Sequence, residues 1–231
     1  GVNRISFGFQ SLNNKLLKFL DRIHTSDQCI SAFNDARESG FENINTDMIF
    51  NIPGQSLKIL SENLDTIVNL GPEHISSYSL TVEKGTMLYN NVLKGKILMP
   101  DEKLDYEMYK KTSNIISKGG YKQYEASNYS KKSKECIHNL HYWNLDPYLA
   151  FGPSAHGYDG NRRWWNHRSL DRYISDLKNN ALPINSSEIL TKKNQYNEII
   201  MNGLRTSKGI SIKDLNAIHK SEDFNKNVKK G

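Results

Sequence analysis

Three segments of the chain alternate apolar and polar residues with a period of two. They are Val2–Gln10, Asn43–Ile52 and His74–Glu83. This alternation predicts β-strands with one buried apolar face and one polar face. The residues expected on the apolar faces are Ile5, Phe7, Phe9, Ile44, Met48, Phe50, Ile52, Tyr78, Leu80 and Val82. In the third strand, Ser77, Ser79, Thr81 and Glu83 are expected on the polar face.

Helical patterns separate the three strands. The predicted helices are Asn14–Leu20, Asp27–Ser39 and an apolar stripe from Leu57 to Val68. Strands that alternate with helices predict βαβ units and a parallel sheet. Ordinary parallel strands are apolar on both faces, so a polar face on all three strands indicates the lumen of a barrel that holds a polar ligand. Three strands cannot close a barrel, and the chain opens on a strand with no Met, so we expect the other strands upstream of Gly1.

The remainder of the chain predicts two further parts. Asp101 is expected to cap a helix that runs to Lys118, and Tyr121–Tyr129 is expected to be a strand. Residues 130–168 are rich in aromatic residues and are expected to be irregular. Helical patterns follow at Leu170–Leu177, Tyr196–Leu204 and Ile212–Ile218. We expect an α/β fold in three parts: residues 1–120 as the second half of a barrel, 121–185 as an aromatic-rich α+β segment, and 186–231 as a small helical domain that is cut short.

The charge of the chain favours anionic small molecules over nucleic acid. The formal net charge is +6, but 31 Lys and Arg residues are scattered among 25 acidic residues. The dense runs are Lys131–Lys134 and Lys226–Lys230, which are typical of solvated loops and tails. Cys29 and Cys136 lie far apart and give no disulfide framework, which favours a reducing intracellular compartment. No apolar run has the length of a membrane span and no signal peptide is visible, so we expect a cytoplasmic protein.

The segment His138–Asn144 carries the most distinctive chemistry. It reads His-Asn-Leu-His-Tyr-Trp-Asn and follows Cys136. Imidazole nitrogen and phenolate oxygen are both axial ligands of haem iron, and aromatic rings stack on a porphyrin. An alternative stays open, because the same residues suit an aromatic core strand whose histidines are merely hydrogen-bonded.

Polar residues at the ends of the predicted strands form a second candidate site. Gln10 and Asp47 lie at the same end of adjacent strands and could hold ribose hydroxyls or an amino group, or could equally satisfy loop backbone. The Pro53-Gly54 pair predicts a tight turn at the end of a barrel strand, where active sites are built, although such turns are also common connectors. Arg22 suits a carboxylate partner or is a surface charge.

Two stretches of the aromatic-rich region allow similar alternatives. Residues Gly152–Gly157 form a small-residue loop, which permits close approach to a ligand or makes only a tight bend. The Arg162–Trp165 stretch could present guanidinium groups to propionates beside indole rings. Its tryptophans could instead belong to the core and its arginines to the surface.

Taken together and in order, these stretches resemble the radical S-adenosylmethionine (SAM) proteins related to oxygen-independent coproporphyrinogen III oxidase. The matching segments, spread over nearly all of residues 1–205, are 1–11, 22–24, 45–55, 72–76, 120–125 and 135–143. The His138-Asn139-x-x-Tyr142 signature is similar to the haem chaperone branch of the family rather than to the decarboxylating enzyme. The resemblance implies a partial (β/α)6 barrel with a SAM pocket.

The resemblance also assigns site residues. It places Gln10, Arg22 and Asp47 at positions that hold SAM, with Thr81 and the backbone near His156 approaching the same cofactor.

For haem, the resemblance implies binding by His138 and Tyr142. His138 is the expected ligand of the iron, and His141 stays open as the alternative. Asn139 would then orient His138 by a hydrogen bond, since a ligand imidazole usually has its other nitrogen held.

One feature of the family is missing from this sequence. The family binds a 4Fe–4S cluster through three cysteines in a C-x3-C-x2-C loop, and neither Cys29 nor Cys136 can replace that loop. We expect the cluster ligands upstream of Gly1. Without the cluster, the chain as given could not cleave SAM reductively.

Three functions remain open. The first is a haem chaperone that delivers haem to haemoproteins of the respiratory chain, some of them membrane-associated. The second is oxygen-independent coproporphyrinogen III oxidase, which decarboxylates propionates by radical chemistry in porphyrin biosynthesis. The third is a cluster-free remnant used for protein interaction. The resemblance leaves open whether the protein forms a homodimer when its cluster is loaded.

Overall fold

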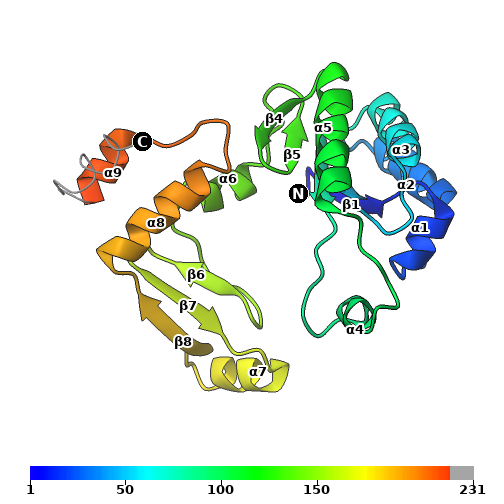
Figure 1. Cartoon of the computed structure of the whole chain (residues 1–231). Coiled ribbons are helices and arrows are strands. Elements are labelled where there is room, and N and C mark those ends of the chain that lie inside the picture. Colours follow the sequence, from blue (N-terminus) through cyan, green and yellow to red (C-terminus); the bar gives the residue numbers. More distant parts are fainter. Residues whose placement is uncertain (219–231) are drawn as a thin grey trace. The chain divides into compact units, whose positions relative to one another are not determined.

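The structure, a computed structural model, describes residues 1–218. The chain divides into two compact units, Gly1–Glu135 and Cys136–Gly231. Figure 1 labels their helices and strands. The division into residues 1–120, 121–185 and 186–231 stays a prediction.

The first unit is built on a five-stranded sheet in the order β1-β2-β3-β5-β4. The strands are β1 (Ile5–Gln10), β2 (Ile44–Phe50), β3 (His74–Ser79), β4 (Lys122–Glu125) and β5 (Asn128–Ser130). The first three are parallel, as predicted, and β5 runs antiparallel to both β3 and β4. The single strand expected over Tyr121–Tyr129 is wrong, because a turn at Ala126 and Ser127 folds this segment into a hairpin.

Helices of the first unit begin where the sequence supplies a capping side chain. They are α1 (Asn14–Phe19), α2 (Ser26–Glu38), α3 (Leu57–Leu70), α4 (Met87–Leu93) and α5 (Glu102–Lys118). Each is preceded by a residue whose side chain accepts first-turn N–H groups: Asn13, Thr25, Ser56, Thr86 and Asp101. Such caps satisfy donors that have no partner within the helix. The cap predicted at Asp101 is confirmed, whereas α4 was not predicted, since it buries no side chain.

The apolar face of the sheet packs against α2 and α5, and α3 packs against α5 (Figure 1). Fully or almost fully buried members of this core are Phe9, Phe33, Ile44, Met48, Leu60, Leu64, Ile67, Ile75, Met108 and Ile116. The helical stripe predicted from Leu57 to Val68 therefore faces the core, as its spacing indicates.

The faces of β3 are the reverse of the prediction. The β2–β3 register pairs Thr46 with Ile75, so Ile75 lies on the core face and is fully buried. Tyr78 lies on the other face and is 41% exposed, so its expected burial is wrong. The strand ends at Ser79, so most of the alternation on which the prediction depended lies in the loop that follows.

The side chains on the polar face of the three parallel strands lie in three rows, one at the amino ends, one in the middle and one at the carboxyl ends. Ser6, Asn45 and His74 lie near the amino ends, Asp47 and Ser76 in the middle, and Ile49 and Tyr78 near the carboxyl ends. Ligands of parallel α/β sheets bind outside the carboxyl ends of the strands. The predicted tight turn after β2 is confirmed at that edge: Gly54 has φ +83°, and the Gln55 N–H donates to the Ile52 carbonyl at 2.8 Å.

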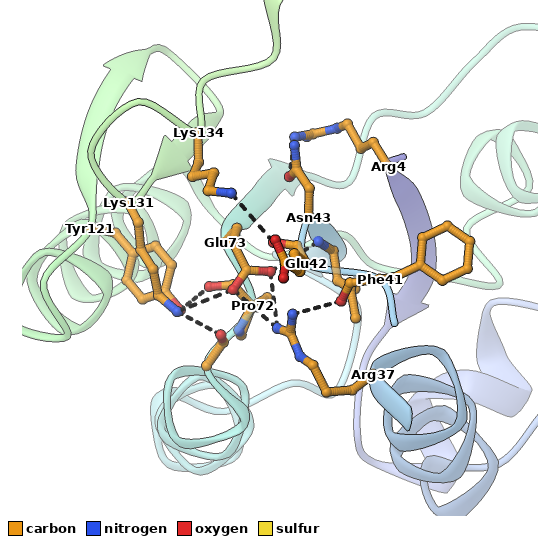
Figure 2. Close-up of polar contacts among 12 residues, drawn as sticks. Arg4, Arg37, Phe41, Glu42, Asn43, Pro72, Glu73, Tyr121, Lys131 and Lys134 are labelled. Atoms are coloured by element: carbon orange, nitrogen blue, oxygen red, sulfur yellow. Dashed lines mark hydrogen bonds and ion pairs between the residues drawn. The ribbon is translucent and has the colours of Figure 1, made fainter. Parts of the chain in front are cut away.

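An ion cluster around Glu73 joins the opposite, amino-terminal edge of the sheet (Figure 2). Arg37 Nη2 donates to both carboxylate oxygens at 3.1 and 2.9 Å, and Lys131 Nζ lies 3.5 Å from Oε1. The Ile44 N–H, at the start of β2, donates to Oε2 at 3.0 Å. Burial opposes ionisation of Glu73, but the Ile44 N–H, Arg37 and Lys131 outweigh it and hold the pKa of the carboxyl below its usual value. Its hydrogen bonds and ion pairs link α2, the start of β2, the start of β3 and the segment after β5.

The second unit contains a three-stranded antiparallel sheet in the order β6-β7-β8. Its strands are β6 (His156–Tyr158), β7 (Arg162–Asn166) and β8 (Ile184–Ile189). Its described helices are α6 (Ile137–Trp143), α7 (Leu170–Lys178), α8 (Lys192–Gly203) and α9 (Ile212–Ile218). The expectation that 130–168 is irregular is wrong, because α6, β6 and β7 lie in it. β8 was also missed, since its exposed residues show no apolar alternation.

Two predictions made near the carboxyl terminus lie outside the described residues: the Lys226–Lys230 run and the last part of the domain expected over 186–231. Among the described residues, no helix is long and apolar enough to cross a membrane.

Candidate cofactor and haem sites

A hydrogen-bond network around Asn45 lies on the polar face of the sheet, near the amino ends of the strands. Its Nδ2 donates to Ser6 Oγ at 2.7 Å and to Asp47 Oδ1 at 2.6 Å. Its Oδ1 accepts from His74 Nδ1 at 2.5 Å and from Ser76 Oγ at 3.3 Å. Both amide hydrogens and both lone pairs of this buried side chain are used. Asn45 thus fixes the orientation of Asp47.

His74 completes this network as a neutral base. The amide oxygen of Asn45 only accepts, so Nδ1 of His74 carries the proton and Nε2 accepts from the Tyr124 hydroxyl at 2.7 Å. Burial, with the positive charge of Arg4 nearby, lowers the pKa of His74 to about 3. Removing an imidazole from water disfavours its charged form. The His74 imidazole, near the amino ends of the strands, is therefore uncharged.

Asp47 lies in the middle row of the same polar face. Partial burial raises the pKa of Tyr78, and the negative charges of Asp47 and Glu125 raise it further. One oxygen of Asp47 accepts from Asn45, and a carboxylate can accept further hydrogen bonds. Asp47 can thus accept from a ribose hydroxyl or an amino group, as its predicted role requires.

Gln10 reaches the same face through an unusual backbone conformation at the end of β1. Its φ is +63°, and the β1–β2 register shifts between Phe7 and Gln10. Its Nε2 lies 2.6 Å from the point where a Cβ on Gly8 would stand. The amide therefore folds back over Gly8, which permits this approach because it has no side chain.

The other residues expected to hold SAM lie on loops of the first unit. Arg22 is exposed between α1 and α2. Its loop returns to the carboxyl end of β1, because His24 Nε2 lies 3.4 Å from the Phe9 carbonyl oxygen. Thr81 follows β3, and its hydroxyl donates to the Ser79 carbonyl at 3.5 Å. The structure brings the loops of Arg22 and Thr81 to the edge where β1 and β3 end.

Asn51 provides an independent polar group at that edge. It is buried just after β2, and its Nδ2 donates to Ser79 Oγ at 3.3 Å. Its Oδ1 has no hydrogen-bond partner within the described part of the chain. A buried acceptor without a partner is costly, so a ligand donor at this edge would satisfy it.

In the second unit, the aromatic motif forms the short helix α6 and leaves its histidines exposed. His138 and Tyr142 lie one helical turn apart, with ring centroids 5.0 Å apart and planes at 90°. Tyr142 in turn contacts Tyr148 at 4.6 Å, and Tyr148 contacts Tyr158 at 6.0 Å. The alternative of an aromatic core strand is thus wrong, because the segment is helical and no α6 side chain is buried.

The role predicted for Asn139 is not tested by this geometry. Among the described residues, no hydrogen bond joins its amide to the His138 ring, and neighbouring side chains on a helix point in different directions. A different histidine of α6 has the carboxylate partner: His141 Nδ1 lies 2.7 Å from Asp146 Oδ2.

His156 lies on β6 of the second unit, where its ring is 5.9 Å from that of Trp165. The neighbouring Gly157 packs against the indole of Trp164, which occupies the place where a Cβ would stand. This contact accounts for the glycine at 157, and both interpretations of the Gly152–Gly157 loop stay predictions.

Neither cysteine belongs to a cluster of metal ligands. Cys29 is buried in α2, where burial raises the pKa of its thiol, and Cys136 precedes α6 in the other unit. Within residues 1–218, no group of three or more His, Cys, Asp or Glu side chains is placed to hold a metal ion. The described residues therefore do not fit an iron–sulfur cluster.

Comparison with known proteins shows what this chain is similar to. Residues 1–83 match the model of the radical SAM superfamily. The chain is also 39% identical over 213 residues to the haem chaperone HemW of Bacillus subtilis (strain 168). Residues 1–83 are thus a radical SAM domain. Such a domain implies SAM and a 4Fe–4S cluster as cofactors.

Other relatives show the same pattern of similarity. The haem chaperone HemW of Lactococcus lactis (strain IL1403) is 34% identical over 214 residues. A mitochondrial radical SAM domain-containing protein 1 from Danio rerio is 31% identical over 219 residues. These matches and that from Bacillus subtilis cover 91% to 92% of this chain but 49% to 56% of the relatives. The chain thus spans about half the length of the curated relatives it matches.

A solved structure confirms the predicted fold class. Coproporphyrinogen III oxidase (HemN) from Escherichia coli, a radical SAM enzyme, matches 94% of this chain and 52% of its own chain with a TM-score of 0.75. The identity is 18%, so the likeness is one of fold. The α/β architecture inferred from strand periodicity is the radical SAM fold.

Sequence reasoning missed the residues that position Asp47. Asn45, His74, Tyr78 and Tyr124 were not considered as site residues. The position of Asn45 two residues before Asp47 is a signal for the first. Tyr124 gives none, because it meets His74 across 50 positions of sequence.

Proposed function

We propose that the protein to which this chain belongs is a haem chaperone, which binds haem at α6 and delivers it to client haemoproteins. The observation that carries the proposal is the exposed face of α6, where the imidazole of His138 and the phenol of Tyr142 lie together. A helix with no buried side chain does not need these residues for its own packing. Relatives named as haem chaperones over most of this chain support the proposal.

The residues of α6 suit haem as cargo. His138 supplies an imidazole for the iron, as the family signature implies, and the rings of Tyr142 and Tyr148 provide aromatic surface for the porphyrin. Ile137 is 70% exposed at the start of the helix and adds apolar surface. These side chains offer both a ligand and a surface on which a macrocycle can pack.

SAM is assigned to the first unit. Gln10 and Asp47 face the polar side of the sheet, and Arg22 and Thr81 occupy loops at its edge, while His156 stays a predicted contact from the second unit. The unpartnered Asn51 oxygen supports this assignment, because it can accept from a further donor at the same edge. When bound beside a reduced 4Fe–4S cluster, SAM supplies radical chemistry in the superfamily. The described residues do not fit that cluster, so the role proposed for them is limited to holding SAM.

Oxygen-independent coproporphyrinogen III oxidase is the second candidate. The fold shared with HemN favours it. That enzyme and a haem chaperone would both hold a tetrapyrrole, but only the enzyme would remove carboxyl groups from it. The client proteins, a membrane-associated client, the homodimer and the cytoplasmic location stay predictions.

A haem titration followed by absorbance, on the longest natural form of the protein, tests the proposal. We expect stoichiometric binding with a shifted Soret band, and a weaker or altered band for His138→Ala. His24→Ala removes an imidazole from the first unit and serves as the control with unchanged spectra. Absence of specific binding by the unmodified protein would overturn the chaperone proposal.

A further inference from the structure

A second histidine of α6 has the geometry of a metal ligand. His141 occupies one of the two variable positions of the His138-Asn139-x-x-Tyr142 signature, so the family pattern assigns it no role. Its Nδ1 lies 2.7 Å from Oδ2 of Asp146. A carboxylate can only accept, so Nδ1 carries a proton, and in the neutral imidazole Nε2 keeps its lone pair. The His141 side chain is 54% exposed, which leaves Nε2 accessible.

The backbone holds this pair in place. The N–H of Asp146 donates to the carbonyl of His141 at 2.9 Å, so the two residues are joined twice. Leu145 adopts a φ of +59° between them, and the Asn144 N–H donates to the Leu140 carbonyl at 2.8 Å. The turn that ends α6 thus holds the Asp146 carboxylate beside the His141 imidazole. A histidine oriented in this way, with its other nitrogen held by a carboxylate, is the usual arrangement around protein-bound metals.

The surroundings of His141 suit a flat apolar ligand. Ile137 precedes it by one helical turn and is 70% exposed. Residues four positions apart lie on the same face of a helix, so Ile137 offers apolar surface on the face that carries His141. The ring of His138, by contrast, is packed against the ring of Tyr142, with the two ring centroids 5.0 Å apart.

We propose that Nε2 of His141 is an axial ligand of the haem iron, and that Asp146 is the positioning residue that orients it. The proposal rests on the haem-binding function proposed above and moves the iron ligand from His138 to His141. Two imidazoles three residues apart on one short helix cannot bind opposite faces of a single haem, so His138 then contributes through the ring surface that it forms with Tyr142. The carboxylate of Asp146 makes the imidazole a stronger electron donor to the iron.

Haem titrations of the longest natural form test this assignment with four variants. His141→Gln is expected to weaken haem affinity by more than about 10-fold, since loss of the outer partner of a metal ligand alone costs about 10- to 100-fold, and to change the Soret and charge-transfer bands. Added free imidazole is expected to restore the bands. Asp146→Asn keeps a hydrogen-bond acceptor but loses the charge, so the bound haem should keep its spectrum and show a more positive midpoint potential.

Asp176→Asn is the matched control. Asp176 forms the other His–Asp pair of the second unit, with Oδ2 3.1 Å from His167 Nε2. Its substitution should leave haem affinity, spectrum and potential unchanged. Circular dichroism of each variant verifies that it is folded, and His141→Ala provides a second variant of the same exposed position.

The outcomes separate this inference from the function on which it rests. If the unmodified protein binds haem and His141→Gln matches it in affinity and spectrum, the ligand assignment is overturned while the chaperone proposal stands. If the unmodified protein binds no haem, both are overturned. A potential that Asp146→Asn does not move would overturn the positioning role of the carboxylate.

Discussion

Nδ1 of His74 lies 2.5 Å from Oδ1 of Asn45, and this contact determines how the polar face of the radical SAM sheet is organised. The histidine donates, so the amide of Asn45 must turn its Nδ2 toward Asp47, 2.6 Å away. A residue at the amino end of β3 thereby orients a carboxylate on β2 that is predicted to hold SAM. His74 and Asn45 thus orient Asp47 without themselves contacting the predicted ligand.

Replacement of Asn45 by Ala should disrupt this support. The change removes every hydrogen bond of the amide and leaves His74 Nδ1 without its acceptor, at a cost of about 3 kcal/mol in the free energy of unfolding. Urea denaturation of the longest natural form measures the loss. Asn90→Ala, at an exposed position of α4, is the control and should stay within about 0.5 kcal/mol of the unmodified protein. Equal stabilities of the two variants would contradict the role given to Asn45.

His74 should make the stability sensitive to acid. Its pKa is about 3 in the folded protein against 6.5 as its ordinary value. Between these two pH values the unfolded chain binds a proton at His74 and the folded chain does not. The contribution of His74 to the free energy of unfolding is therefore complete above pH 6.5 and is lost as the pH falls from there toward 3. The loss is up to about 1.4 kcal/mol per pH unit. Denaturation series at several pH values should show a shallower decline for His74→Gln. An identical slope in that variant would show that His74 is not the responsible group.

Gly8→Ala should affect SAM binding without affecting stability. A Cβ at this position would stand 2.6 Å from Gln10 Nε2, the mobile end of a long side chain, so the amide moves aside. We expect SAM affinity, measured by calorimetry on the cluster-loaded full-length protein, to fall about as much as for Gln10→Ala. Sites that act through one another are not additive, so the double variant should match Gln10→Ala. Additive losses would mean that Gly8 acts independently of Gln10.

The ion cluster of Figure 2 should be structural. Glu73→Gln leaves Arg37 and Lys131 without their carboxylate and should lower the free energy of unfolding by about 2 kcal/mol, a value reduced for the partial exposure of both cations. Glu62→Gln removes an exposed carboxylate 3.9 Å from Lys58 and should change stability by less than about 0.5 kcal/mol. Because the pKa of Glu73 is lowered, its contribution should be present above pH 4.5 and disappear at lower pH. A Glu73→Gln variant as stable as Glu62→Gln would contradict this view.

The sequence predicts the first unit better than the second. Parallel strands alternating with capped helices have strong local signals, such as Asp101 before α5 and the Pro53-Gly54 turn after β2. The orientation of β3 depends on its register with β2, which places Ile75 inside and Tyr78 outside. No local pattern encodes that register.

The site residues follow the same rule. Gln10 and Asp47 could be found because they are polar residues on adjacent strands with polar faces, although Asp47 lies in the middle of β2 and not at its end as predicted. The contact of His74 with Tyr124 forms only when a hairpin 50 positions later folds against the sheet. In the second unit, α6 was missed because the aromatic residues of His138–Asn144 suit a strand as well as a helix. The pairing of His141 with Asp146 depends on that helix and on the turn that ends it.

The central claim is that the complete protein carries haem rather than decarboxylating its precursor. One experiment compares both activities of the full-length, cluster-loaded protein under reducing conditions with SAM: transfer of bound haem to an apo-haemoprotein, and release of carbon dioxide from coproporphyrinogen III. We expect haem transfer that His138→Ala and His141→Gln diminish, with no release of carbon dioxide. Catalytic release of carbon dioxide, without haem transfer, would contradict the claim.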